Sequence, residues 1–377
     1  MATPPKHDAW RVVDMINQSP PVDCSKAYDT SSLAGKTILI TGGASGFGAA
    51  FARHWARHGA HLIIGDVNDG AGEELVAELR SSSSSEPTTQ FITYQHCDVT
   101  SWTDQLALFK TAAASSPTRT IDAVVAGAGI VERGTANLFD LPQNLDSTSP
   151  SPPPPALQVL AVNLTGVMYT THLALFYLPL LNPNSRGNKD SHLLLISSIA
   201  GLCPLPGQTE YTTSKHAVMG LFRALRGTAW TTKGVRVNVL APYFVDTPLL
   251  PPAGLALLAG GAKAELEDVV DAGTRLMADE GIRGRALVVG PKMRVVDCDA
   301  HHEEEDGGVR IVEGERQKGE ERRQAVWEVY GDDYERVEVF MWRYLAVLNI
   351  MRAIRGWVGF VKDFLGIFVG KRGEGRR

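Results

Sequence analysis

Short apolar runs alternate with longer stretches of helical spacing from Lys36 to Val289. The runs are rich in β-branched residues, which is typical of buried strands. Seven of them occur, at Thr37–Thr41, Leu62–Gly65, Phe91–Cys97, Ile121–Ala126, Leu193–Ser197, Val235–Leu240 and Arg285–Val289. The stretches between them, such as Gly48–His58 and Leu266–Met277, have the spacing of crossover helices. This alternation predicts an α/β fold with a doubly wound, seven-stranded parallel sheet flanked by helices.

The pattern divides the chain into four parts. We expect an N-terminal arm at 1–33, the α/β domain at 34–297, a charged linker at 298–325 and an amphipathic helical extension at 326–377. Two low-complexity inserts, Ser81–Ser85 and Ser147–Pro155, are expected to be exposed loops. His301 and His302 lie beside glutamates in the linker, where a solvated segment rather than a metal site is expected.

The composition narrows the classes of function. The chain has 37 Lys and Arg against 42 Asp and Glu, a net charge of −5, which excludes a broad basic surface for nucleic acid. The four cysteines lie far apart, as in proteins of a reducing compartment. The first residues lack the apolar core of a signal peptide. A cytoplasmic protein is therefore expected.

The first predicted strand leads directly into the sequence TGGASGFG at 41–48, and a helical stretch follows. Glycines at such a turn let the backbone approach a pyrophosphate, and the helix N-terminus offers free N–H groups to it. A glycine-rich turn without a ligand is the alternative, but this setting favours a Rossmann-type dinucleotide site. The candidate contacts are Thr41, Gly42, Ser45, Gly46, Phe47 and Gly48.

Asp66 ends the second predicted strand, and no Lys or Arg lies in the glycine turn. A carboxylate there can accept hydrogen bonds from the adenosine ribose hydroxyls and would repel a 2′-phosphate. NAD is therefore expected as the cofactor rather than NADP. Asp98, after the third strand, is expected either to contact the adenine amino group or to cap a helix that begins near Ser101.

Tyr211 and Lys215 are four residues apart in a stretch of helical spacing, so both side chains fall on one helix face. Tyrosine has a pKa near 10, and a neighbouring ammonium and a cationic nicotinamide would lower it toward neutrality. Ser198 ends the fifth predicted strand, at the edge of the sheet where ligands bind. With the glycine turn, these residues predict a site for proton transfer to a bound substrate.

The motifs TGGASGFG, CDV, AGAG, VNLTG, ISS, YTTSK and VRVNVLAP make the chain resemble the short-chain dehydrogenase/reductase family over about residues 33–290. By that resemblance, Tyr211 is the general acid/base, and Lys215 lowers its pKa and holds the nicotinamide ribose. Ser198 would polarise the substrate oxygen, and Asn163 would position a water molecule that links Lys215 to solvent. The resemblance implies further cofactor contacts at Val67, Val99, Ala128, Gly129, Pro242, Val245 and Thr247.

Two positions depart from the family pattern. Ala126-Gly127-Ala128-Gly129 stands where Asn-Asn-Ala-Gly is usual, and this removes an asparagine that ties neighbouring strands together. Tyr243 stands in place of a glycine and is expected to line the substrate pocket. Gln208, three residues before Tyr211, is expected either to reach the substrate oxygen or to be a turn residue.

The segment 243–263 is rich in Leu, Ala, Pro and Gly and carries almost no charge, so an apolar alcohol or ketone is the expected substrate. The expected function is an NAD(H)-dependent oxidoreductase acting on an apolar secondary alcohol and its ketone. The alternative is a nucleotide-binding sensor or scaffold without turnover, tethered to a membrane by its C-terminal helix.

Residues 349–369 have an amphipathic helical pattern, with their polar side chains in one narrow arc. Two interpretations stay open: peripheral contact with a membrane, or docking on the chain's own domain or on a second copy. Members of the family commonly pair through the helices that carry Asn163 and Tyr211, so the oligomeric state is open as well.

Overall fold

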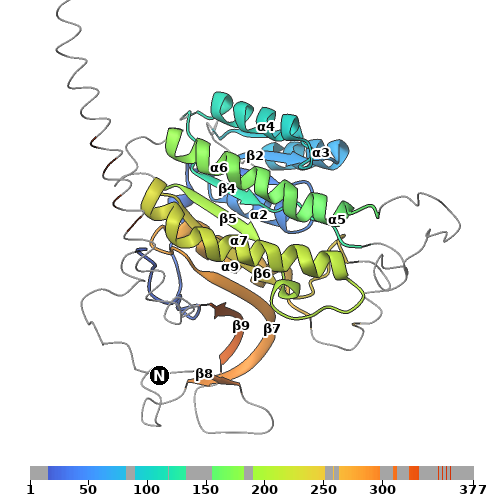
Figure 1. Cartoon of the computed structure of the whole chain (residues 1–377), viewed down its shortest axis with the longest axis vertical. Coiled ribbons are helices and arrows are strands. Elements are labelled where there is room, and N and C mark those ends of the chain that lie inside the picture. Colours follow the sequence, from blue (N-terminus) through green and yellow to red (C-terminus); the bar gives the residue numbers. More distant parts are fainter. Residues whose placement is uncertain are drawn as a thin grey trace, which may run out of the picture. The chain divides into compact units, whose positions relative to one another are not determined.

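A nine-stranded sheet organises the structure, which is a computed structural model (Figure 1). The structure describes residues 16–81, 90–117, 119–132, 155–181, 190–250, 258, 263–297, 309–311 and 322–330, and the single positions 347, 350, 354 and 357. The sheet and its helices belong to one unit, Gln18–Gly331. Met1–Asn17 and Asp332–Arg377 form a separate unit.

Seven strands of the sheet are parallel and follow the order β3-β2-β1-β4-β5-β6-β7. They are β1 (Thr37–Thr41), β2 (His61–Asp66), β3 (Ile92–His96), β4 (Ala123–Ala126), β5 (His192–Ile196), β6 (Arg236–Pro242) and β7 (Ala286–Asp297). The strand order reverses between β1 and β4, and at that point the carboxyl ends of the strands open a crevice for ligands. The predicted doubly wound α/β fold is therefore confirmed.

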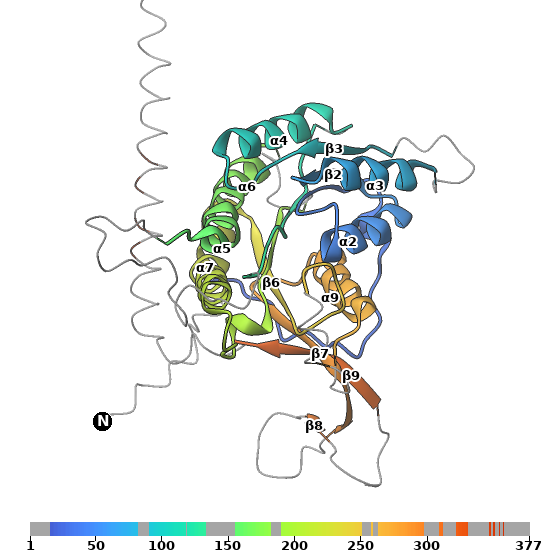
Figure 2. The same cartoon turned by 90° about the vertical axis from the view of Figure 1, so that its right-hand side faces the viewer.

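Helices cover both faces of the sheet, as Figure 2 shows. One face carries α2 (Gly46–Arg57), α3 (Asp69–Ser81) and α9 (Leu266–Ala278), and the other carries α4 (Trp102–Ser115), α6 (Val167–Leu181) and α7 (Thr209–Lys233). Shorter elements are η1 (Ser31–Leu33), α5 (Gln158–Leu160), η2 (Ala161–Gly166) and η3 (Ile199–Gly201). This arrangement places two apolar cores, one on each side of the strands.

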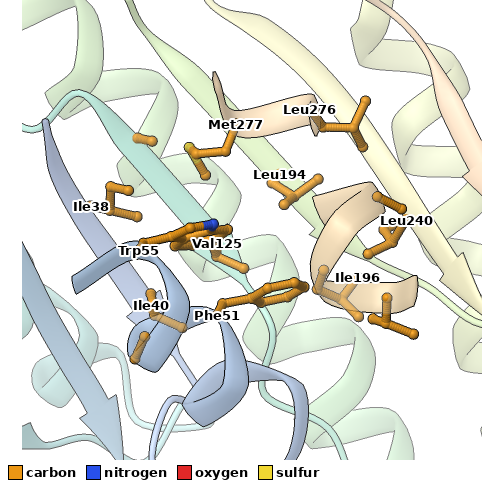
Figure 3. Close-up of a cluster of buried hydrophobic side chains, with 14 of the residues drawn as sticks. Ile38, Ile40, Phe51, Trp55, Val125, Leu194, Ile196, Leu240, Leu276 and Met277 are labelled. Carbon is orange, nitrogen blue, oxygen red and sulfur yellow. The ribbon is translucent and has the colours of Figure 1, made fainter. Parts of the chain in front are cut away.

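Two stacked aromatic rings anchor the core beneath α2 (Figure 3). Phe51 and Trp55 are fully buried, and their ring centroids lie 4.8 Å apart. The indole of Trp55 donates a hydrogen bond of 2.9 Å to the hydroxyl of Thr274 and so joins α2 to α9. A Cβ atom at Gly273 would lie 2.4 Å from the ring of Phe51, so only glycine allows the two helices to approach this closely.

The sheet continues beyond the seven strands that the sequence pattern predicts. β7 runs on to Asp297, and two further strands pair with it antiparallel: β8 (Val309–Ile311) and β9 (Arg322–Val329). β9 buries Ala325 and Val326, and its Glu328 forms a 2.7 Å ion pair with Arg285. Polar residues are common on edge strands, which explains why the charged composition of this stretch concealed them.

The N-terminal segment that precedes β1 packs on the sheet unit. Leu33 is fully buried, and Arg285 binds the main-chain carbonyl of Ser19. The Tyr28 hydroxyl donates to the Asp271 carboxylate over 2.9 Å, and the Tyr28 ring lies 4.5 Å from the Arg275 guanidinium. Residues 18–33 are therefore attached to the face that carries α9.

Several predictions fall largely on residues that the structure leaves undescribed. These are the two low-complexity inserts, the histidine pair of the linker and most of the pattern at 349–369, of which Ile350, Ile354 and Trp357 are helical and exposed. Among the described residues, Gln158–Pro179 has the length and mean hydropathy (1.4) to cross a membrane, but 44% of that window is buried, as expected for a helix packed on a sheet. The membrane and oligomer interpretations stay predictions.

Candidate active site

The glycine turn between β1 and α2 is held by backbone contacts that exclude side chains. Gly42 has a φ of +69°, and a Cβ atom on it would lie 2.5 Å from the Cα atom of Ala128. A Cβ atom on Gly48 would lie 2.3 Å from the carbonyl oxygen of Gly42. Ser45 is the N-cap of α2, but its side chain makes no capping hydrogen bond. The helix also has no acidic residue in its first turn, so its positive end faces the turn uncompensated.

Asp66 lies against this turn from the end of β2. Its Oδ2 atom accepts a hydrogen bond from the Ala44 amide at 3.0 Å, and Oδ1 accepts one from the Asn68 amide at 3.1 Å. The neighbouring Val67 is exposed. Because two main-chain amides orient the carboxylate, it is held at the mouth of the turn rather than free to rotate away.

Two roles are expected for Asp98: a contact with the adenine amino group, or capping of the helix that begins near Ser101. The Oδ1 atom of Asp98 accepts hydrogen bonds from both the amide and the hydroxyl of Thr100, each at 2.8 Å. The N-cap of α4 is Ser101, whose hydroxyl accepts from the Asp104 amide at 3.2 Å. Ser101 and not Asp98 is therefore the cap of α4, so that alternative for Asp98 is wrong. The adenine contact of Asp98 stays a prediction.

Thr41 bridges β1 and β4 where the sequence lacks the usual asparagine. Its hydroxyl donates to the carbonyl oxygen of Val125 and accepts from the Gly127 amide, each at 3.3 Å. Two long hydrogen bonds from one hydroxyl thus connect the neighbouring strands, which compensates in part for the missing amide side chain.

Asn163 lies in η2, a π-helical turn between α5 and α6. Its side chain is fully buried and exchanges two hydrogen bonds of 2.8 Å with the amide and carbonyl groups of Ile130. The same amide donates to the Ser214 hydroxyl at 3.2 Å. A π-turn widens the helix, and such turns often accompany functional sites. Asn163 therefore ties the chain after β4 to α7.

Tyr211 and Lys215 lie on the buried face of α7, as their spacing predicts. The Lys215 Nζ atom is 5.6 Å from the centroid of the Tyr211 ring and donates to the Ile196 carbonyl at 3.1 Å. A Cβ atom on Gly129 would lie 3.4 Å from Asn163 Oδ1 and 3.5 Å from Lys215 Nζ, so both side chains face Gly129. The structure thus brings together Tyr211, Lys215 and Asn163.

Burial controls the protonation of this cluster. It lowers the pKa of the Lys215 ammonium to about 8. It also raises the pKa of Tyr211, and hydrogen bonding with the Ser198 side chain opposes that rise. The lowering of this pKa by a neighbouring ammonium and a cationic nicotinamide stays a prediction, and burial of the phenol acts against it.

A cavity of about 530 Å³ opens beside these residues. Ser198, Gln208, Tyr211 and Tyr243 line it, together with the cofactor candidates Phe47, Pro242, Val245 and Thr247. Ser198 follows β5 and caps η3, and its hydroxyl accepts from the Ala200 amide at 3.2 Å. Most of the remaining wall is apolar, with Val131, Ile199, Leu205, Pro206, Phe244, Leu249, Leu250 and Leu258. Residues 251–257 and 259–262 of the expected substrate loop lie outside the described residues.

Glu132 also lines the cavity, and the sequence pattern does not predict it as a site residue. Its carboxylate accepts a hydrogen bond from the Tyr211 amide at 3.4 Å, and its carbonyl oxygen accepts one from the Gln208 side chain at 3.4 Å. The available signal was its place six residues after β4, on the carboxyl side of the sheet. Among the described residues, no group of three His, Cys, Asp or Glu side chains is arranged to hold a metal ion.

The part of the chain that forms the sheet unit is similar to known proteins. Residues 36–255 match a family described as short chain dehydrogenase. The chain is 37% identical over 276 residues to a 5′-hydroxyaverantin dehydrogenase of Dothistroma septosporum, covering 70% of this chain and 87% of that protein. It is 31% identical over 284 residues to an NADP-dependent dehydrogenase of Cochliobolus lunatus, covering 73% and 95%. The solved 3-ketoacyl-(acyl-carrier-protein) reductase of Brucella melitensis, complexed with NADH, matches with a TM-score of 0.54 at 24% identity over 68% of this chain and 97% of that chain, which supports the fold.

Proposed function

Because this chain belongs to the short-chain dehydrogenase/reductase family, we propose that it is an NAD(H)-dependent enzyme that interconverts an apolar secondary alcohol and its ketone. Oxidoreductase chemistry, a nucleotide cofactor and a small-molecule substrate come with the family. The observation that carries the finer proposal is the position of Tyr211 and Ser198 on the wall of a largely apolar cavity, with Lys215 buried behind them.

In this proposal, four side chains carry out the chemistry. Tyr211 exchanges the hydroxyl proton with the substrate oxygen, and Ser198 donates a hydrogen bond to that oxygen. Lys215 and Asn163, whose side chains both face Gly129, would supply the proton path behind the phenol. A bound nicotinamide ring would accept or deliver the hydride. Gln208 and Tyr243 would contact the substrate, since both line the cavity.

The residues around the glycine turn fit a dinucleotide. Gly42 and Gly48 let the turn pack against Ala128 and against its own backbone, and this tight turn would present the N-terminus of α2 to a pyrophosphate. The Ser45 hydroxyl, which makes no capping hydrogen bond, would bind the pyrophosphate as well. Asp66 would bind the adenosine ribose, and Asp98 the adenine. The remaining proposed contacts are Thr41, Gly46, Phe47, Val67, Val99, Ala128, Gly129, Tyr211, Lys215, Pro242, Val245 and Thr247.

We propose NAD rather than NADP because of the fixed carboxylate of Asp66. The amides of Ala44 and Asn68 orient it at the mouth of the glycine turn. A 2′-phosphate at that place would meet a negative charge that cannot turn away, whereas ribose hydroxyls can donate to it. A relative named as NADP-dependent makes this choice worth testing directly.

The test combines cofactor binding with turnover. Purified protein is titrated with NADH and with NADPH by nicotinamide fluorescence, and a panel of apolar secondary alcohols is assayed with NAD. Tyr211→Phe should keep NADH binding and lose at least about a hundredfold in turnover, because a positioned acid/base contributes that much. Tyr169→Phe, on α6 and outside the cavity, is the matched control. Binding without turnover of any alcohol or ketone would contradict the proposal and favour a nucleotide sensor.

A further inference from the structure

The apolar cavity has one charged corner. Glu132 is the only Asp, Glu, Lys or Arg among the described residues that line the cavity, and Gln208 lies beside it. Both contact the first turn of α7, on which Tyr211 lies. A ligand whose reacting oxygen meets Tyr211 therefore extends within reach of an acidic side chain.

Two side-chain oxygen atoms on the cavity wall accept no hydrogen bond from the described residues. The Glu132 Oε2 atom accepts from the Tyr211 amide, but Oε1 is buried and accepts no hydrogen bond from any residue that the structure describes. The Gln208 Oε1 atom is in the same condition. The Gln208 amide nitrogen faces the Glu132 carbonyl oxygen, which fixes the orientation of the amide because only a donor can face a carbonyl. Both open atoms are therefore acceptors.

Among the described residues that line the cavity there is no Lys or Arg that would neutralise Glu132. The adjacent Glu210 is also buried, and its pKa is raised by burial and by the negative charge of Glu132. Buried polar atoms are normally paired, and an unpaired one marks either an energetic cost or a place that a ligand completes. Here the two unpaired atoms come from two residues that both line the substrate cavity.

We infer that Glu132 and Gln208 form a specificity site for a hydroxyl group that the substrate carries in addition to its reacting carbinol. The inference rests on the proposed function and narrows its substrate class to a largely apolar alcohol, or its ketone, with a second O–H donor. The cavity volume of about 530 Å³ is enough for an alcohol of this class that carries a fused aromatic ring.

The test distinguishes the effect of a hydrogen bond donated by the ligand from the effect of the ligand's size. The probes are 1-(6-hydroxynaphthalen-2-yl)ethanol and its 6-methoxy analogue, which can accept but not donate at that position. Turnover is measured as kcat/KM with NAD. Binding of the two corresponding ketones to the protein with NAD, a complex that has no hydride to transfer, is measured by calorimetry. The variants are Glu132→Gln, which replaces the open acceptor by a donor, and Gln208→Met, which removes the other acceptor. Glu74→Gln, on the exposed face of α3, is the matched control.

We expect the wild-type protein and Glu74→Gln to prefer the hydroxyl probe by about tenfold or more, in binding and in kcat/KM, as for a hydrogen bond to a charged group. Glu132→Gln should lose or reverse that preference, and Gln208→Met should reduce it. Turnover of both probes with equal kcat/KM would overturn the inference and leave the proposed function standing. Hydroxyl-selective binding without turnover would support the inference and count against the proposed function. Binding of neither ketone would overturn the inference for this class of compound.

Discussion

Lys215 on α7 is bound by Ile196, the last residue of β5: its Nζ atom donates a 3.1 Å hydrogen bond to the Ile196 carbonyl oxygen. Among the described residues, the Ile196 carbonyl is the one hydrogen-bond acceptor of this buried ammonium group. That single contact does not replace the hydration that the charge loses on burial, and the pKa of Lys215 falls to about 8 as a result.

This lowered pKa predicts a pH-dependent stability. An unfolded chain keeps the Lys215 proton up to about pH 10.4, whereas the folded protein releases it near pH 8. Between these values the unfolded state binds more protons, so folding stability rises with pH. Below about pH 8 both states are protonated, and the full cost of burying the charge is present.

The measurement compares the ligand-free wild-type protein with Lys215→Met by urea unfolding. From about pH 7.5 to about pH 9.5 we expect the wild-type protein to gain about 2 kcal/mol relative to the variant. Other titrating groups are common to both proteins and cancel in the difference. A difference that stays constant over this range would show that the buried ammonium does not titrate there.

The carboxylate of Asp66 should decide between the two dinucleotides. Asp66→Asn removes the negative charge but keeps an oxygen that can accept from the Ala44 amide. We expect the ratio of the NADPH to the NADH dissociation constant to fall at least about tenfold, which corresponds to about 1.4 kcal/mol. Fluorescence titration measures both constants. Glu74→Gln removes a charge from α3 outside the turn and should leave the ratio as it is; an unchanged ratio in Asp66→Asn would contradict the assignment of NAD specificity.

Two glycines in helices offer a matched pair of substitutions. In Gly48→Ala the new methyl group would lie 2.3 Å from the Gly42 carbonyl oxygen, so the glycine turn must shift. Nothing lies within 4 Å of the corresponding position on Gly220, which is exposed on α7. We expect Gly48→Ala to lose stability and at least about tenfold in NADH affinity. Gly220→Ala should gain about 0.5–1 kcal/mol and keep its affinity.

Thermal unfolding and NADH titration of both glycine variants test this pair. The contrast depends only on where the methyl group points, since the chemical change is identical. If Gly48→Ala bound NADH as well as Gly220→Ala does, the close approach of the backbone at the turn would not matter for the cofactor.

Much of the fold could be predicted from the sequence because it depends on patterns within short segments of the chain. The seven apolar runs correspond to the seven parallel strands, and a buried parallel strand has to be apolar on both faces. The turn at 41–48 could be predicted from its glycines because only glycine tolerates the close backbone contacts of this turn. Tyr211 and Lys215 were readable as a pair because α7 is continuous, which makes spacing along the chain a measure of spacing in the structure.

Other parts depend on contacts that no local pattern encodes. β8 and β9 are polar strands whose partner, β7, lies many residues earlier in the chain. The π-helical turn at Asn163 reflects hydrogen bonds to Ile130 in another segment. Glu132 reaches the cavity from an irregular segment after β4, where periodicity does not indicate which way a side chain points.

The antiparallel pairing of β9 with β7 has a consequence for synthesis of the chain on the ribosome. Ala286–Val289 pair with β6 on one side and with Val326–Val329 on the other. Every other parallel strand meets its neighbours within the first 289 residues, so most of the sheet can assemble before β9 exists. Until residues 322–329 leave the ribosome, β7 presents an open row of amide and carbonyl groups, which is a template for aggregation. β9, the last strand in the described part of the chain, is therefore the one that covers this edge of the nascent sheet.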